Sequence, residues 1–230
     1  MYENNFNRIE QKYLLTKNQY KSLFNKINEY IEKDKYYNSK ICNVYFDNEQ
    51  EEMITHSIEK PVFKQKVRIR SYEIPSLDDD VFLEVKTKYK KVVTKRRIKV
   101  KLNDFNHYLK TGKYNYEDQI MREIDYLFSY YHLKPFYFLA YDRKSYRGIQ
   151  DNNLRITVDA NLRSRRDNLS LNKGDEGEYY FKDGMYIMEI KYLNALPLWL
   201  VRSLSDLKIY PTSFSKLGNI YKKERSEKVC

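Results

Sequence analysis

The chain has 230 residues, 43 of them basic and 32 acidic, and it carries a net charge of +11. Its 24 tyrosines and 11 phenylalanines, within a hydrophobic fraction of 41%, exclude a disordered chain and allow a sizeable core. The basic excess favours an anionic partner: nucleic acid, a phosphorylated small molecule, polyphosphate or a membrane surface. Composition does not choose among these.

The cysteines and the apolar segments bear on the compartment. Cys42 and Cys230 are too few for a disulfide framework or a cysteine-based zinc site, so we expect a reducing compartment. No segment approaches the roughly 20 apolar residues of a membrane-spanning helix, and residues 1–10 lack an apolar signal-peptide core. We expect a cytoplasmic protein without a transmembrane segment, and a membrane-protein partner stays unknown.

The first half of the chain is predicted to alternate between strands and helices. A strand over Phe6–Leu15 leads to a helix that Thr16 caps and that runs to about Asp34, because apolar residues recur on one stripe. Lys40–Asp47 is expected as a strand, and residues 49–52 as a polar turn. Further strands are expected at about 62–73, 80–89 and 91–101.

The second half begins with a short helix that opens at Asp104 and a longer helix over Glu117–His132. Later, Pro197 starts a helix that runs to about Leu207, and Ser215–Lys223 is expected as a final helical turn. The strands between these helices are expected at 135–147, 154–163 and 178–193. No linker rich in Gly, Pro or Ser divides the chain, so we expect a single domain over residues 1–230.

Charged residues occupy every second position in five of the strand-like segments. In Lys64–Tyr72, Lys or Arg stands at the even positions up to 70, while Val67 and Ile69 lie between them. The other segments are 82–88, 141–143, 155–159 and 189–191. Because successive side chains of a strand point to opposite faces, each segment has one charged face and one apolar face.

This pattern predicts an α+β fold with mostly antiparallel hairpins, since no regular βαβ alternation is present. We expect a closed antiparallel β-barrel of about eight strands that forms a cationic tunnel and is covered by helices. The alternative is a half-buried sheet whose charges face water. That alternative fits the whole set less well, because the charged positions repeat Arg, Lys and Glu instead of mixing in Thr, Ser and Gln.

A series of short motifs extends over nearly the whole chain. They are Glu10-x-Lys12, Val44–Asp47, Arg68-x-Arg70-x-Tyr72, Glu84-x-Lys86-Thr87, Lys95–Arg97, Tyr141-x-Arg143, Arg155-x-Thr157-x-Asp159, Glu189-x-Lys191 and Ser215–Gly218. In this order they resemble the VTC domain, the polyphosphate-polymerase branch of the triphosphate tunnel metalloenzyme (CYTH-like) superfamily.

The resemblance implies a metal-dependent phosphotransferase. It would transfer the γ-phosphoryl group of ATP to a growing polyphosphate chain inside a basic tunnel, with ATP and inorganic polyphosphate as partners and no nucleic acid. It also implies Mn²⁺ or Mg²⁺ as the cofactor, with Glu189 as the matched ligand; Glu10 and Glu84 are alternatives, unless they pair with neighbouring lysines. A tripolyphosphatase or nucleoside triphosphatase, a non-catalytic polyphosphate-binding module and a nucleic-acid-binding protein stay open.

The expected phosphate contacts follow from the motifs and from the shared parity. Arginine can bind phosphate through two parallel hydrogen bonds and lysine binds it as a point charge, which suits a reaction that depends on positioning and charge neutralisation. The expected catalytic residues are Lys12, Arg68, Arg70, Lys86, Arg143, Arg155 and Lys216. The expected substrate-binding residues are Lys66, Lys88, Lys95, Arg97, Tyr141, Lys191 and Ser215.

Overall fold

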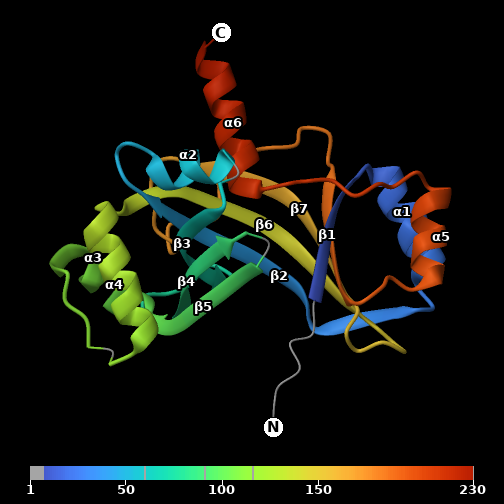
Figure 1. Ribbon diagram of the computed structural model, residues 1–230, viewed down its shortest axis with the longest axis horizontal. Helices are drawn as coiled ribbons and strands as arrows, with labels where there is room; N and C mark the ends of the chain where they lie inside the picture. The colour runs from blue at the N-terminus through green and yellow to red at the C-terminus, as the bar shows by residue number, and fades with distance from the viewer. Residues whose placement is uncertain (1–7, 60, 91, 116, 230) are drawn as a thin grey trace. The chain divides into compact units, whose positions relative to one another are not determined.

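The computed structural model of the chain (Figure 1) describes residues 8–59, 61–90, 92–115 and 117–229. Its strands are β1 (Arg8–Leu15), β2 (Ile31–Asp47), β3 (Phe63–Tyr72), β4 (Asp80–Tyr89), β5 (Val92–Lys101), β6 (Lys134–Gly148), β7 (Arg155–Arg165), β8 (Glu178–Tyr179) and β9 (Tyr186–Leu193). Its helices are α1 (Lys17–Ile27), α2 (Glu52–Ile58), α3 (Leu102–Thr111), α4 (Gln119–Tyr131), α5 (Leu198–Asp206) and α6 (Lys216–Val229). Within these ranges, no helix combines the length and the apolar composition needed to cross a lipid bilayer.

The strands form a sheet of nine in the order β1-β9-β7-β6-β2-β3-β4-β5, with β8 paired to β7. This order ends at β1 and at β5, so the sheet is open and the predicted closed barrel is wrong. Closure depends on hydrogen bonds between the first and last strands of the order. The alternation within each strand looks the same in an open and in a closed sheet, so it did not distinguish the two.

The contacts of the chain divide it into two compact units. Unit 1 consists of Met1–Ser39, Tyr141–Leu162 and Tyr179–Lys216, and unit 2 of Lys40–Ala140, Arg163–Glu178 and Leu217–Cys230. Strands β2, β6 and β7 contribute residues to both units. This division does not test the single domain expected over residues 1–230, which stays a prediction.

Unit 1 has its core under helices α1 and α5, which lie side by side (Figure 1). Leu23 of α1 and Leu200 of α5 are buried with Ile156 of β7 and Ile190 of β9. Helix α1 starts where expected, because Thr16 Oγ1 accepts a hydrogen bond from the backbone N–H of Gln19, and Gln19 Oε1 accepts one from the backbone N–H of Thr16. The apolar face of these strands is therefore the one that packs against helices.

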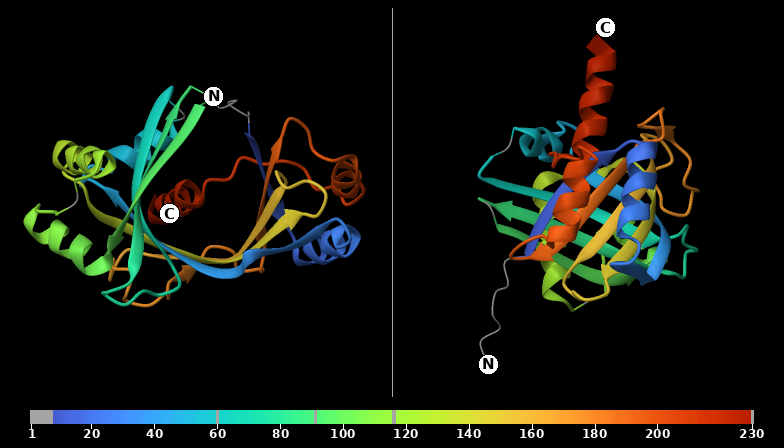
Figure 2. Two further views of the ribbon diagram at one scale, coloured as in Figure 1. Left: turned by 90° about the horizontal axis from the view of Figure 1, so that it is seen from below. Right: turned by 90° about the vertical axis from the view of Figure 1, so that its right-hand side faces the viewer.

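Unit 2 has its core between β3–β5 and helices α3 and α4, which lie together on one side of these strands (Figure 2). Val67, Ile69 and Val85 are buried there against Phe105 of α3 and Ile124 of α4. Successive side chains of a strand point to opposite faces, so the Arg and Lys residues that alternate with these apolar residues lie on the other face of β3, β4 and β5. Directly opposite residues of an antiparallel ladder share a face, which brings these cations together.

Several boundaries differ from the predictions. Helix α1 ends at Ile27, and β2 begins at Ile31 instead of Lys40. Helix α2 replaces part of the expected turn and the residues after it, and the strand expected at 178–193 is split into β8 and β9. Strands β3, β4 and β5 lie within one residue of the predicted bounds. The first two residues of the strand expected from Phe6 lie outside the described residues.

Candidate functional site

Two charged rows cross three neighbouring strands of unit 1. In the first, Lys12 of β1 pairs with Glu189 of β9, and Glu189 pairs with Thr157 of β7. The second row contains Glu10, Lys191 and Arg155. Residues directly opposite each other in an antiparallel ladder lie on one face, so the sheet itself brings these side chains together.

A buried ion cluster lies on β6 and β7 of unit 1. Asp159 has a side chain that is only 1% exposed, and Arg143 donates to its two oxygens from Nε at 2.6 Å and Nη2 at 2.8 Å. Lys216 Nζ lies 2.6 Å from Asp159 Oδ2. Both cations also lie over the ring of Tyr141, at 5.2 Å for Arg143 and 4.6 Å for Lys216.

This cluster keeps all of its members charged. Burial raises the pKa of Asp159, but the charges of Lys216 and Arg143 and their hydrogen bonds outweigh burial and hold the pKa at about 2. Burial likewise lowers the pKa of Lys216, but the Asp159 carboxylate outweighs it and holds the pKa above its ordinary value. A carboxylate with two cations leaves one positive charge in excess.

Glu189 lies beside this cluster and is also ionised. Its carboxylate is 12% exposed, and Oε1 lies 2.9 Å from Lys191 Nζ. Burial raises the pKa of Glu189, but Lys191, Lys12 and Arg143 together hold it below the ordinary value. Lys12 Nζ lies 3.4 Å from Glu10 Oε1 and donates to the Phe214 carbonyl at 3.3 Å.

Arg155 is the outlying member of the predicted set in unit 1. Its side chain is half exposed, and its guanidinium binds Asp34 Oδ2 from Nη2 at 2.5 Å and from Nε at 3.1 Å. The Asp34 carboxyl has a lowered pKa, mainly because it accepts this hydrogen bond from Arg155. Arg155 would have to leave or share Asp34 in order to contact a phosphate.

Unit 2 carries a second charged face on β2–β5. Its most unusual row places Lys66, Lys86 and Lys95 directly opposite one another across three strands. Like charges in such positions repel each other. The rows on either side contain Lys64 with Lys88, and Tyr45 with Arg68, Glu84 and Arg97.

Glu84 is the buried counter-ion of this face. Its side chain is 1% exposed; Arg68 donates to Oε2 from Nε at 2.8 Å, and Lys95 Nζ lies 2.5 Å from Oε1. Burial raises the pKa of Glu84, but Arg68, Arg70 and Lys95 outweigh it and hold the pKa at about 2. The Glu84 carboxylate is thus paired with Arg68 and Lys95. As a metal ligand, it would have to leave at least one of these cations.

Two polar groups of β2 complete the second face. Tyr45 Oη accepts a hydrogen bond from Arg68 Nη1 at 2.9 Å, and Asn43 Oδ1 accepts one from Arg70 Nε at 2.8 Å. Burial raises the pKa of Tyr45, but the charges of Arg68, Arg70 and Lys66 outweigh it and lower the pKa to about 8.

The structure thus gathers the predicted residues into two sets, one in each unit. In unit 1 they are Lys12, Tyr141, Arg143, Glu189, Lys191 and Lys216, with Arg155 at the end of a row and Ser215 directly before α6. In unit 2 they are Lys66, Arg68, Arg70, Lys86, Lys95 and Arg97, with Lys88 one row further along.

The site residues predicted from the sequence did not include Asp159, Thr157, Tyr45 or Asn43. The available signal for the first two was their position in the Arg155-x-Thr157-x-Asp159 motif, at the same parity as the arginine. Tyr45 and Asn43 share a parity in β2 and lie opposite Arg68 and Arg70. That pairing depends on the register of two strands, which their sequences do not show.

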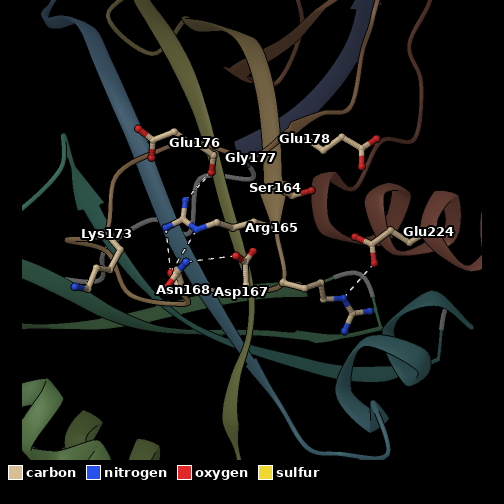
Figure 3. A pocket seen from close by; sticks show the side chains of 10 residues that line it. Ser164, Arg165, Asp167, Asn168, Lys173, Glu176, Gly177, Glu178 and Glu224 are labelled. Atoms are coloured by element: carbon tan, nitrogen blue, oxygen red, sulfur yellow. Dashed lines mark hydrogen bonds and ion pairs between the residues drawn. The ribbon is translucent and has the colours of Figure 1, made fainter.

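A hollow of about 510 Å³ lies elsewhere in unit 2 (Figure 3) and is lined by residues such as Arg165, Lys173, Glu176 and Glu224. None of the predicted site residues lines it. Arg165 donates to the backbone carbonyls of Glu176 at 2.6 Å and Asn168 at 3.1 Å. Its charge therefore holds the surrounding loop, and we do not take this hollow as the candidate site.

The metal requirement can be tested on the carboxylates of unit 1. In the part of the chain that the structure describes, no group of three or more His, Cys, Asp or Glu side chains could hold a metal ion by itself. Mg²⁺ commonly binds through one or two carboxylates, with substrate phosphates and waters completing its shell. The ionised Glu189 carboxylate, with Glu10 in the neighbouring row, fits that mode of binding. It does not fit a site in which the protein supplies every ligand.

The comparison with known families decides the assignment. The model of the VTC domain matches residues 7–224. The chain belongs to the VTC domain family. The predicted resemblance is therefore confirmed, and the two charged faces described above are those of a VTC domain.

Two solved structures resemble this VTC domain in fold at low sequence identity. A proposed adenylate cyclase from Bacillus halodurans is 14% identical, with 90% of this chain and 93% of that chain covered and a TM-score of 0.55. A proposed adenylyl cyclase from Hippeastrum, reported to have a dominant triphosphatase activity, is 15% identical, with 94% and 96% covered and a TM-score of 0.58. These likenesses show the fold. No curated protein matches the chain.

Proposed function

We propose that this VTC domain is a metal-dependent polyphosphate polymerase that transfers the γ-phosphoryl group of ATP to the end of a polyphosphate chain. The observation that carries the proposal is the pair of buried carboxylates, each held by one Arg and one Lys: Asp159 by Arg143 and Lys216, and Glu84 by Arg68 and Lys95. Such pairs fix the directions of cations that would otherwise be flexible, and phosphoryl transfer depends mainly on positioned positive charge.

The side chains of unit 1 would orient the reacting phosphates. Arg143 presents a planar guanidinium that Asp159 holds through two hydrogen bonds, and Lys12 and Lys216 add point charges. These groups are fixed before a substrate arrives, so they need little rearrangement as negative charge shifts during transfer.

The side chains of unit 2 would bind phosphate with less geometric demand. The row of Lys66, Lys86 and Lys95 places like charges directly opposite each other, and an inserted phosphate chain would relieve their repulsion. Arg68 lies in the neighbouring row and Arg70 one row further on the same face, so both guanidinium groups add positive charge to it. ATP and inorganic polyphosphate, which carry several charges each, match such a surface.

Glu189 would hold the divalent cation, Mn²⁺ or Mg²⁺, together with phosphate oxygens. A cation bound there would neutralise negative charge on the transferring phosphoryl group. Lys191 fixes the Glu189 carboxylate at 2.9 Å and keeps it ionised, so the ligand is available at neutral pH.

A tripolyphosphatase or nucleoside triphosphatase is the second candidate, because the similar Hippeastrum structure is reported as a triphosphatase. It would use the same phosphate contacts with water as the acceptor. A cytoplasmic location is part of the proposal for either enzyme; the buried free thiol of Cys42 fits a reducing compartment.

The test is to incubate the protein with ATP and Mn²⁺ or Mg²⁺ and to separate long polyphosphate from orthophosphate on a gel. Long chains support the polymerase, whereas orthophosphate without chains supports the triphosphatase. If neither product forms but tripolyphosphate still raises the unfolding temperature, the domain is a binding module. A stabilisation by DNA and none by tripolyphosphate would refute all three and favour nucleic-acid binding.

A further inference from the structure

Thr157 has a buried side chain whose hydroxyl forms no hydrogen bond with the described residues. It is 7% exposed, and its Oγ1 has no hydrogen-bond partner among the described residues. A buried polar group left without a partner costs about 1–3 kcal/mol, so native proteins contain few of them. Valine has nearly the same shape and suits a strand equally well, so strand formation alone does not explain a threonine here.

The surroundings of Thr157 are charged, and their charges are already paired with each other. Thr157 lies directly opposite Glu189, which pairs with Lys12 in the next strand. Glu189 binds Lys191. Asp159, which follows Thr157 by two residues in β7, binds Arg143 and Lys216. The hydroxyl is therefore a neutral donor on a face that otherwise offers ionised groups.

We propose that the Thr157 hydroxyl donates a hydrogen bond to a non-bridging phosphate oxygen of the bound triphosphate or polyphosphate. This inference rests on the proposed function, because it requires phosphate on this face of unit 1. A hydroxyl that donates to an anionic oxygen makes a shorter and stronger bond than one between neutral groups. It also adds a directional contact beside Lys12, whose ammonium binds phosphate without a fixed direction.

The experiment compares Thr157→Val, which removes the hydroxyl at constant shape, with Thr157→Ser, which retains it. Dissociation constants for tripolyphosphate are measured by calorimetry in EDTA, and unfolding temperatures are measured without ligand. Thr94→Val is the matched control, since Thr94 is exposed on β5 and pairs with Thr87, and its parity places it on the opposite face of the strand from Lys95.

We expect Thr157→Val to weaken tripolyphosphate binding roughly 10- to 100-fold, as for a lost hydrogen bond to a charged group, while its unfolding temperature is unchanged or higher. Thr157→Ser and Thr94→Val should bind like the wild type. A purely structural hydroxyl would behave differently, because its removal would lower the unfolding temperature.

Several results would overturn the inference. Equal binding by the wild type and Thr157→Val would do so, as would a loss of stability in Thr157→Val that parallels the loss of binding. A binding defect that appears only when Mn²⁺ replaces EDTA would assign the contact to the cation and not to phosphate. If the wild type itself does not bind tripolyphosphate, the proposed function fails, and the inference falls with it.

Discussion

Lys191 Nζ lies 2.9 Å from Glu189 Oε1, on the same strand and two residues away. The pair keeps the carboxylate ionised but also shields it, because a divalent cation at Glu189 must share the group with an ammonium. Phosphate oxygens would attract Lys191 as well, so substrate and metal would enter this site together. On the proposed function, the Glu189 carboxylate would serve the metal more than the anion.

Glu189→Gln should therefore abolish turnover and spare binding. We expect kcat with ATP and Mn²⁺ to fall at least about 100-fold, because the variant loses a charged metal ligand. The dissociation constant for tripolyphosphate should stay the same or become smaller, since one negative charge is removed. Glu49→Gln is the control, because Glu49 is exposed and pairs with Lys134. Turnover at the wild-type rate in Glu189→Gln would show that the metal lies elsewhere.

Asp159→Asn should destabilise the unliganded protein by about 3 kcal/mol, because a buried ion cluster that loses one partner leaves uncompensated charge. Tripolyphosphate should then bind more tightly, by roughly tenfold, because Arg143 and Lys216 no longer share their hydrogen bonds with Asp159. Denaturant unfolding with and without tripolyphosphate measures both effects. An unchanged stability would contradict the structural role of this cluster.

The same carboxylate predicts a pH dependence at the acid end. Its pKa is about 2 in the folded protein against an ordinary 3.8, so Asp159 contributes stability above about pH 4 and loses it as the pH falls towards 2. The contribution is about 2 kcal/mol. The acid limb of the unfolding free energy should be shallower in Asp159→Asn than in the wild type, and parallel limbs would argue against the lowered pKa.

Tyr45 predicts a pH dependence at the alkaline end. Its pKa is lowered to about 8, and an ordinary tyrosine has a pKa of 10.0, so its stabilising contribution is absent below about pH 8 and complete only above pH 10. The stability difference between the wild type and Tyr45→Phe should grow by about 2 kcal/mol from pH 8 to 10. Ultraviolet titration should show a tyrosine ionising near pH 8 that Tyr45→Phe lacks. Bound tripolyphosphate should move that ionisation upwards.

Lys86→Gln should weaken tripolyphosphate binding at low salt, because it removes the middle charge of the Lys66, Lys86 and Lys95 row. The loss of affinity should shrink as salt screens the charges. Lys110→Gln on the exposed side of α3 serves as the control. A salt-independent effect of Lys86→Gln would mean that its role is not electrostatic.

Local patterns predicted the elements whose stability is local. The β3–β5 hairpins followed from alternation and turn residues, and the start of α1 followed from the Thr16 cap. The end of α1 did not, because Tyr30 continues the apolar stripe but stacks on Trp199 instead and accepts a backbone hydrogen bond from Ile149. Helix α2 was missed because its first N–H groups are bound by the buried Asp47 carboxylate, which the sequence shows only as a strand end.

The candidate site was predictable to a similar extent. Parity and motif placed the cations on common faces, since both depend on positions within single strands. The partners of those cations depend on contacts between elements: Glu84 of β4 meets Lys95 of β5, 11 residues away in sequence, and Asp159 of β7 meets Lys216 of α6, 57 residues away. Closure of the sheet depends on the same kind of long-range pairing, and there the prediction was wrong.

Because Asp159 and Glu84 already neutralise part of each charged face, they set a threshold for any anion from solution. Chloride or a single orthophosphate would have to compete with an internal carboxylate for a cation, and would gain little. A polyphosphate chain would contact several cations of one face at once, and each further phosphate would then bind at a high effective concentration. The buried carboxylates would thereby make binding depend on the number of charges that an anion carries. A long chain would bind firmly, and small anions would exchange.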